Sequence, residues 1–160
     1  MNHAAEMPAL QQAVTTCRTH REALQEALED LRQRALTASD LEHLTKEDRR
    51  LLDQFAYRYT RLQDDMGNRL MSAALRAMGE EISGMPMLDR LNRLEQLGWL
   101  PSADEWADLR RIRNEFTHDY PETATERFER LQLALASARG LLEILAGIDQ
   151  RIHQRFPGME

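Results

Sequence analysis

The stretch from Thr45 to Ala77 reads TKEDRRLLDQFAYRYTRLQDDMGNRLMSAALRA and says most about the class of fold. Apolar or small residues recur in it at steps of three and four, which is the repeat of one face of an α-helix. Thr45 can cap the first free amides of such a helix, and Asp48 follows three residues later, as in a capping box. The stretch therefore predicts one amphipathic helix of about seven turns. Its apolar face consists of Leu52, Phe55, Tyr59, Leu62, Met66, Leu70, Ala73 and Ala77.

Four further amphipathic helices are predicted on the two sides of this stretch. They run from Pro8 to about Leu36, from Met87 to Leu97, from Ser102 to about Tyr120, and from Thr123 with an apolar face that reaches Ile152. Residues 37–40 and 79–86 are expected to be breaks between helices. No segment has the pattern of a strand. Short connections between long amphipathic helices predict an all-α fold, an antiparallel bundle of about five helices in one domain over residues 1–160.

The fourth helix has the clearest boundaries in the sequence. Ser102 and Glu105 form a capping box at its start, and Pro121 disfavours helical geometry in the residue before it. Trp99 and Trp106 flank the turn into this helix, and we expect them to pack that turn rather than to stack on bases.

The composition indicates which classes of protein this chain can belong to. Its 160 residues are 42% apolar and 30% charged, as in one soluble domain with a hydrophobic core. No apolar run approaches the ~20 residues that cross a bilayer, and the first residues lack the charged-then-apolar plan of a signal peptide. The single cysteine, Cys17, excludes an internal disulfide framework. We therefore expect a cytoplasmic protein that does not enter a membrane.

The net charge of -6 argues against a general coat for nucleic acid, because non-specific binding depends on a basic surface. A small basic site is still compatible with that charge. Arg110, Arg111 and Arg113 form such a cluster inside the acidic chain, so any binding of nucleic acid is expected to be local.

Residues 113–120 read RNEFTHDY and carry the most pointed chemical pattern of the chain. Arg113 can hold a phosphate with its planar fork of donors. His118 can move a proton near neutral pH. Together the two could cleave RNA without a metal, with the 2′-hydroxyl attacking the neighbouring phosphorus.

A helical wheel places the polar side chains on one side of the fourth helix. At about 100° per residue, His118 lies ~140° from Arg113, with Arg110, Asn114 and Thr117 between them. The opposite arc holds Leu109, Ile112 and Phe116. A single helix holds the arginine and the histidine too far apart to grip one phosphate. Two copies that meet across a two-fold axis are therefore expected to pair them.

Structural roles for the same residues remain open at the level of sequence. An exposed, arginine-rich helix face is commonly a solvated surface. A histidine near a helix C-terminus also complements the helix dipole, and Asn114 could simply hold His118 by a hydrogen bond. Tyr120 could be a packing residue with its hydroxyl in water.

Other chemistries have less support. Five scattered histidines and one cysteine give no cluster at metal-ligand spacing, and no glycine-rich phosphate loop is present, so we expect no metal and no cofactor. Asp149 and His153 are four residues apart on a helix, which fits a surface pair. Cys17 and His20 share a helix face, but no third group completes a nucleophilic site.

With this motif on the penultimate helix, the chain resembles the HEPN superfamily and, within it, the HepT-like proteins. Their signature is an arginine, commonly a polar residue, a spacer, a histidine, one further residue and a tyrosine. Arg113, Asn114, His118 and Tyr120 match it position for position. The likeness continues through residues 55–64, 85–91 and 94–98 to Trp106, and it covers most of residues 45–122.

This resemblance implies a four-helix core and a homodimer or higher oligomer in which two motifs face one cleft. It also implies a metal-independent ribonuclease toxin that acts on RNA and is partnered by a minimal nucleotidyltransferase antitoxin. His118 would then be the general base or acid, Arg113 would stabilise charge on the phosphate, and Asn114 would orient either group. Tyr120 would accept AMP from the antitoxin, which silences the nuclease. Arg110 and Thr117 are candidates for further contacts with phosphate or RNA.

Two other functions are compatible with the same residues. The chain could be a non-catalytic module that docks a nucleotidyltransferase or its nucleotide, with Arg113 and His118 in recognition. It could also be a helical scaffold without an active site.

Overall fold

A computed structural model describes residues 3–118 and 123–159, and these residues form helices and connecting loops without a strand. The prediction of an all-α fold is therefore confirmed. In chain order the elements are a 3-10 helix His3–Glu6, α1 Met7–Gln33, α2 Ala38–Glu42, α3 Lys46–Asp65, a π-helix Met66–Leu70, α4 Met71–Ala77, α5 Met87–Gln96, α6 Ala103–His118 and α7 Ala124–Arg155.

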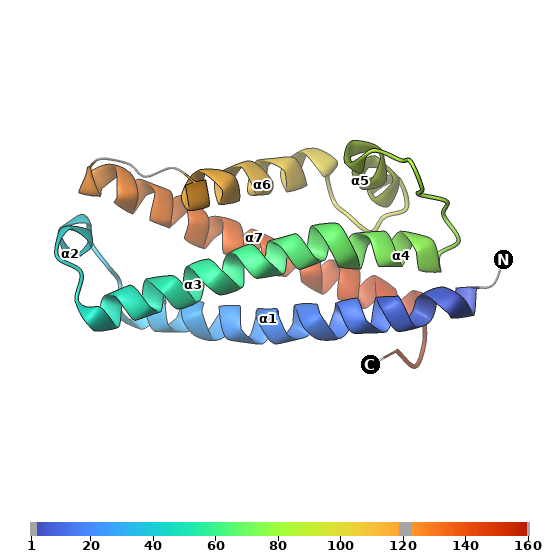
Figure 1. Ribbon diagram of the computed structural model, residues 1–160, viewed down its shortest axis with the longest axis horizontal. Helices are drawn as coiled ribbons and strands as arrows, with labels where there is room; N and C mark the ends of the chain where they lie inside the picture. Colours follow the sequence, from blue (N-terminus) through green and yellow to red (C-terminus); the bar gives the residue numbers. More distant parts are fainter. Residues whose placement is uncertain (1–2, 119–122, 160) are drawn as a thin grey trace.

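The long helices lie side by side along the longest axis of the molecule (Figure 1). α1 and α3 run in opposite directions in close contact, and α6 and α7 form a second contacting pair. The short α5 lies at the end where α4 finishes and α6 begins, and α2 lies at the other end against α7. The four long segments enclose one core between them. It includes Leu24, Phe55, Leu75, Trp106 and Leu141, each no more than 1% exposed.

The predicted helix over residues 45–77 is present, but it contains a π-helical turn that the sequence pattern did not indicate. The backbone amide of Met71 bonds to the carbonyl of Met66, one residue further back than in an α-helix. Gly67 in this turn lies against the indole of Trp106, and a Cβ at this position would be 3.2 Å from the ring. The wide turn thus occurs where the backbone of this helix and the largest buried side chain of α6 approach closely. Trp106 is 1% exposed and Trp99 is 6% exposed, so both tryptophans pack inside the molecule as predicted.

The prediction of a break at residues 37–40 was wrong in part, because α2 begins at Ala38 within this segment. Thr37 caps α2 by accepting a hydrogen bond from the Asp40 amide, and the Asp40 carboxylate accepts one from the Thr37 amide. This reciprocal cap uses residues that also fit a turn, which is why the pattern alone favoured a break. The predicted end of the fourth helix near Tyr120 lies outside the described residues.

Aromatic side chains join three of the long helices at the centre of the core. The rings of Phe55 and Tyr59 on α3 are stacked with centroids 5.4 Å apart, and Phe116 of α6 lies 5.7 Å from Phe55. The Tyr59 hydroxyl donates a hydrogen bond of 2.8 Å to the hydroxyl of Ser137 on α7. This buried bond joins α3 to α7 and fixes the position of the Tyr59 ring between them.

Substituting Tyr59→Phe is expected to lower the free energy of unfolding by about 1 kcal/mol, because it leaves the buried Ser137 hydroxyl without its donor. Urea unfolding measures the change. The double variant with Ser137→Ala should recover part of the loss, since both polar groups are then gone. Identical stability of the Tyr59→Phe and wild-type proteins would show that the bond contributes nothing.

Helix α7 is long and apolar enough, by length and composition alone, to cross a membrane. The core helix of a soluble protein passes the same test, and ten residues of α7 are buried inside the molecule. Helix α7 packs against α6, α2 and α1, and 44% of its most apolar stretch is buried inside the molecule. The expectation of a cytoplasmic protein stays a prediction.

Candidate functional site

Arg113 lies where α6 faces α3, and its guanidinium is held on two sides. One terminal nitrogen donates a 2.7 Å hydrogen bond to the carboxylate of Asp64 on α3, and the other donates a 2.9 Å bond to the Asn114 side-chain oxygen. The Arg113 side chain is 16% exposed and that of Asp64 is 35% exposed. A charge-assisted pair of this kind offsets much of the cost of taking the arginine out of water. The guanidinium is therefore fixed in orientation before any ligand arrives.

This placement corrects the helical wheel, which put Arg113 on a polar side opposite the core together with His118. Arg113 lies at the edge of the core because α3 supplies a counter-charge there, whereas His118 is exposed at the last described position of α6. No hydrogen bond or ion pair joins the two residues within the described parts of the chain. The structure thus brings Arg113 and Asn114 together and leaves His118 apart from them.

Asp64 is the site residue that sequence reasoning missed. It is 49 residues away from Arg113 along the chain, so only the packing of α3 against α6 brings the two together. Its position on the polar side of a long predicted helix is the only local signal, and many acidic residues share that property.

The remaining candidate residues differ in whether their side chains are already hydrogen-bonded within the protein. The Thr117 hydroxyl donates to the backbone oxygens of Arg113 and Asn114 at 3.0 and 3.3 Å, so it serves its own helix. Arg110 is exposed, one turn before Arg113. The Asn114 side-chain oxygen accepts its hydrogen bond from Arg113 and not from His118. Asn114 therefore orients the arginine. Tyr120 lies outside the described residues, and the structure places neither its ring nor its hydroxyl.

A second polar cluster joins α1 to α3 beside the candidate site. The His20 ring donates from Nε2 toward Asp65 at 3.2 Å, and Arg58 donates to Nδ1 at 3.1 Å. Because arginine can only donate, Nδ1 must be the acceptor and the imidazole is neutral. Burial lowers the pKa of His20, the charge of Arg58 lowers it further, and Asp65 opposes both.

The free energy of unfolding is expected to fall between about pH 7 and pH 5, in part because of His20. The folded pKa of His20 is below its ordinary value of 6.5, so the unfolded chain takes up the proton first as the pH falls. The contribution is complete above the unfolded pKa and is lost as the pH falls through the folded one. His20→Gln should flatten this part of the curve in urea unfolding. An equal slope in both proteins would contradict the assignment.

Cys17 lies one turn before His20 but does not form a nucleophilic pair with it. The thiol is 1% exposed, and burial, with a smaller effect of the Asp65 charge, raises its pKa to about 12. Asp65 contacts His20 and could complete a nucleophilic site of cysteine, histidine and carboxylate, which the sequence did not reveal. The raised pKa disfavours the thiolate that a nucleophilic cysteine needs.

Metal-ligand geometry is not found in the described parts of the chain, where no group of three or more His, Cys, Asp or Glu residues could hold an ion. His153 bonds through Nδ1 to the Asp149 backbone oxygen at 2.8 Å. The Asp149 carboxylate faces Arg18 at 3.3 Å and Arg21 at 3.8 Å. The Asp149 carboxylate is thus engaged with α1, a contact that the predicted surface pair did not include.

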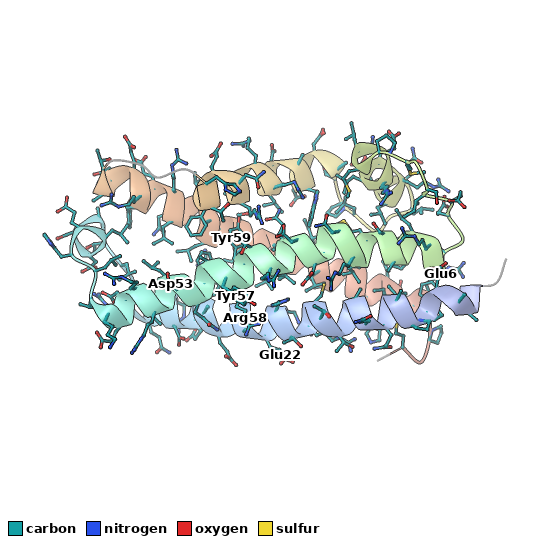
Figure 2. The ribbon with its side chains drawn as sticks, viewed as in Figure 1. Glu6, Glu22, Asp53, Tyr57, Arg58 and Tyr59 are labelled. Atoms are coloured by element: carbon teal, nitrogen blue, oxygen red, sulfur yellow. The ribbon has the colours of Figure 1, made fainter. Side chains whose placement is uncertain are left out.

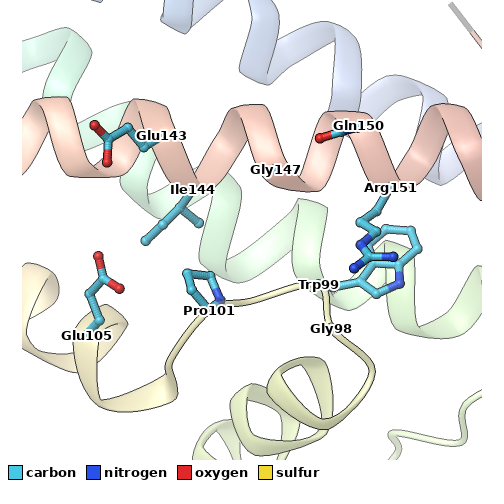
Figure 3. A pocket seen from close by; sticks show the side chains of 9 residues that line it. All are labelled: Gly98, Trp99, Pro101, Glu105, Glu143, Ile144, Gly147, Gln150 and Arg151. Carbon is cyan, nitrogen blue, oxygen red and sulfur yellow. The ribbon is translucent and has the colours of Figure 1, made fainter.

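A surface hollow of about 470 Å³ lies elsewhere, beside the turn into α6 (Figure 3). Glu105 and Glu143 flank one end of it, and Arg151 lies at the other end. Residues 110–118 do not line it. The candidate site is therefore the seam between α3 and α6, where a pre-oriented guanidinium could bind a phosphate and an exposed imidazole could exchange protons.

Comparisons of the chain with protein-family models, with curated proteins and with solved structures found no match.

Proposed function

We propose that this protein is a metal-independent endoribonuclease toxin of the HEPN type, with a composite active site between two copies of the chain. The observation that carries the proposal is the guanidinium of Arg113, which Asp64 and Asn114 hold at 2.7 and 2.9 Å where α6 faces α3. A donor fixed in advance stabilises developing charge without a cost of reorganisation during the reaction.

The reaction uses groups of the protein and of the RNA. The imidazole of His118 takes the proton of a 2′-hydroxyl while that oxygen attacks the adjacent phosphorus. The bond from phosphorus to the 5′-oxygen breaks, and that oxygen takes a proton from water. The products are a 2′,3′-cyclic phosphate and a free 5′-hydroxyl. Arg113 stabilises the charge on the non-bridging oxygens, and Asn114 and Asp64 keep it in position.

The need for two copies follows from the placement of the two groups. Arg113 is largely buried against α3, and His118 is exposed on a different side of α6 without a contact to it. A two-fold dimer that apposes two α6 helices would set the histidine of one protomer over the arginine of its partner. The proposed fold is accordingly a HEPN-like four-helix core that dimerises.

The proposed partner is a minimal nucleotidyltransferase antitoxin. It would transfer AMP from ATP to the Tyr120 hydroxyl, with pyrophosphate leaving. The added bulk and negative charge would then exclude RNA. A protein in which Tyr120 is replaced by phenylalanine should cleave RNA and resist this silencing, and intact-mass measurement would detect any AMP added elsewhere.

Incubating the purified protein with RNA in excess EDTA tests the activity. We expect fragments that end in 2′,3′-cyclic phosphate and a protein that elutes as a dimer when its mass is measured by light scattering. Cleavage that disappears with EDTA, or that the His118→Ala protein retains, would reject the proposal.

One observation favours the non-catalytic docking module as a second candidate. Asp64 already neutralises Arg113 in the single chain, as in a structural ion pair. Such a module would bind a nucleotidyltransferase without cleaving RNA in any oligomeric state, so the same assay separates the two functions.

A further inference from the structure

Tyr57 lies on α3 beside α1 (Figure 2), and it is the large aromatic side chain that the described surface exposes most, at 51%. The guanidinium carbons of Arg58 and Arg61 are 5.3 and 5.6 Å from the centre of its ring. Half of the residue is still open to solvent with both arginines in place. The ring of His20 on α1 also meets the Tyr57 ring edge-on, with centroids 6.4 Å apart, and the core does not depend on Tyr57, because Tyr59 of the same helix already packs there.

Tyr57 shares a face of α3 with Asp64, the residue that holds Arg113. The two are seven residues apart, which is about two turns and ~10 Å along the helix axis. The end of α6 lies at the same level, because the ring of Phe116 is 5.7 Å from Phe55 and 6.0 Å from Tyr59. Tyr57 therefore lies level with the end of α6 that bears His118, on the side of α3 that is next to α1.

The two arginines at this ring have no carboxylate within ion-pair distance among the described residues. Arg58 uses one terminal nitrogen on His20, and its Nε is buried without a hydrogen-bond partner. Arg61 is exposed, and its interaction with the Tyr57 hydroxyl raises its pKa, with smaller effects of Asp65 and Asp64. Positive charge is therefore available next to the open ring, in a chain whose net charge is -6.

We infer that Tyr57 and Arg61 form a subsite for the RNA strand that leads away from Arg113, with an unpaired base on the Tyr57 ring and a phosphate on Arg61. The inference rests on the proposed nuclease function and names its substrate as single-stranded RNA. A stacked strand rises ~3.4 Å per nucleotide, so the ~10 Å along the α3 axis between Tyr57 and Asp64 corresponds to roughly three nucleotides. Stacking accepts any base, since each base has a π face, but it requires that the base be unpaired.

Fluorescence anisotropy with a single-stranded oligonucleotide of 2′-O-methyl riboses tests the subsite apart from catalysis, because the probe lacks the attacking hydroxyl. Tyr57→Ala is expected to weaken binding about tenfold, whereas Tyr57→Phe should bind like wild type because the ring remains. Arg61→Ala should reduce the slope of log Kd against log salt by about 0.7, the value for one phosphate contact on a single strand. Arg155→Ala is the matched control, since it removes another arginine that lies over an aromatic ring, Phe156, at 5.7 Å.

The outcomes separate this inference from the nuclease proposal. If wild-type protein cuts no RNA and Tyr57→Ala still weakens binding about tenfold, the subsite stands and the nuclease function fails. If cleavage depends on His118 but Tyr57→Ala and Arg61→Ala both bind as wild type does, the subsite is wrong and the nuclease function stands. An equal loss in Arg155→Ala, or no binding of the probe by wild type, also overturns the subsite.

Discussion

Replacing His118 with alanine is expected to lower the rate of RNA cleavage by about 10²–10⁴-fold, the usual contribution of a positioned general acid or base. The side chain is exposed at the last described position of α6, so its loss should leave the free energy of unfolding within about 0.5 kcal/mol of wild type. Single-turnover cleavage of a labelled RNA in EDTA measures the rate. His153→Ala is the control, because it removes another exposed histidine, on α7, that the proposed reaction does not use.

Mixing two inactive proteins tests whether the site is composite. Arg113→Gln and His118→Ala protomers that exchange would form heterodimers in which one site has both groups intact and the other has neither. Random pairing should then restore roughly a quarter of the wild-type activity. If arginine and histidine act within one chain, mixing restores nothing. Activity of the His118→Ala protein alone near the wild-type rate would remove the histidine from the mechanism.

Replacing Trp106 with alanine is expected to lower the free energy of unfolding by about 3–5 kcal/mol, the largest stability change that we expect in this chain. The indole is 1% exposed, and it fills the space that the backbone of Gly67 leaves open. Its removal would leave a cavity between the π turn and α6, which the rigid backbone on either side can fill only in part. Urea unfolding followed by circular dichroism measures the change.

Trp106→Phe keeps the test informative if the alanine protein does not fold. It removes less volume and should cost less than the alanine variant. Gly67→Ala probes the other side of the same contact, because a Cβ there would meet the indole at 3.2 Å. A cost of less than about 1 kcal/mol for Trp106→Ala would show that the ring does not support the fold.

Helix starts were the part of the structure that the sequence predicted best. Both predicted capping hydroxyls accept the expected amide: Thr45 from Asp48 at 3.0 Å and Ser102 from Glu105 at 3.1 Å. Thr123, the predicted start of the fifth helix, accepts the amide of Glu126 at 3.1 Å. A cap depends on residues within one turn of each other, so local sequence contains all the information that it needs.

The candidate site was predicted less completely because its geometry depends on contacts between distant segments. Arg113 and Asn114 could be named from the motif, but the partner that positions them, Asp64, is 49 residues away. The same limit hid the bond between Tyr59 and Ser137, which are 78 residues apart. Periodicity also assumes one regular helix, so it could not show the π turn.

Asn68 lies exposed in the π turn, where the amide of Met71 reaches back five residues to Met66. Such a turn contains one residue more than an α-helix requires over the same length. Deleting the codon for Asn68 would let the turn close as ordinary α-helix, and α3 and α4 would keep the faces that they present to the core. The same deletion in the middle of α3 would rotate all later side chains of that helix by about 100°. A deletion of one residue is therefore expected to be tolerated at this turn and not in the middle of α3.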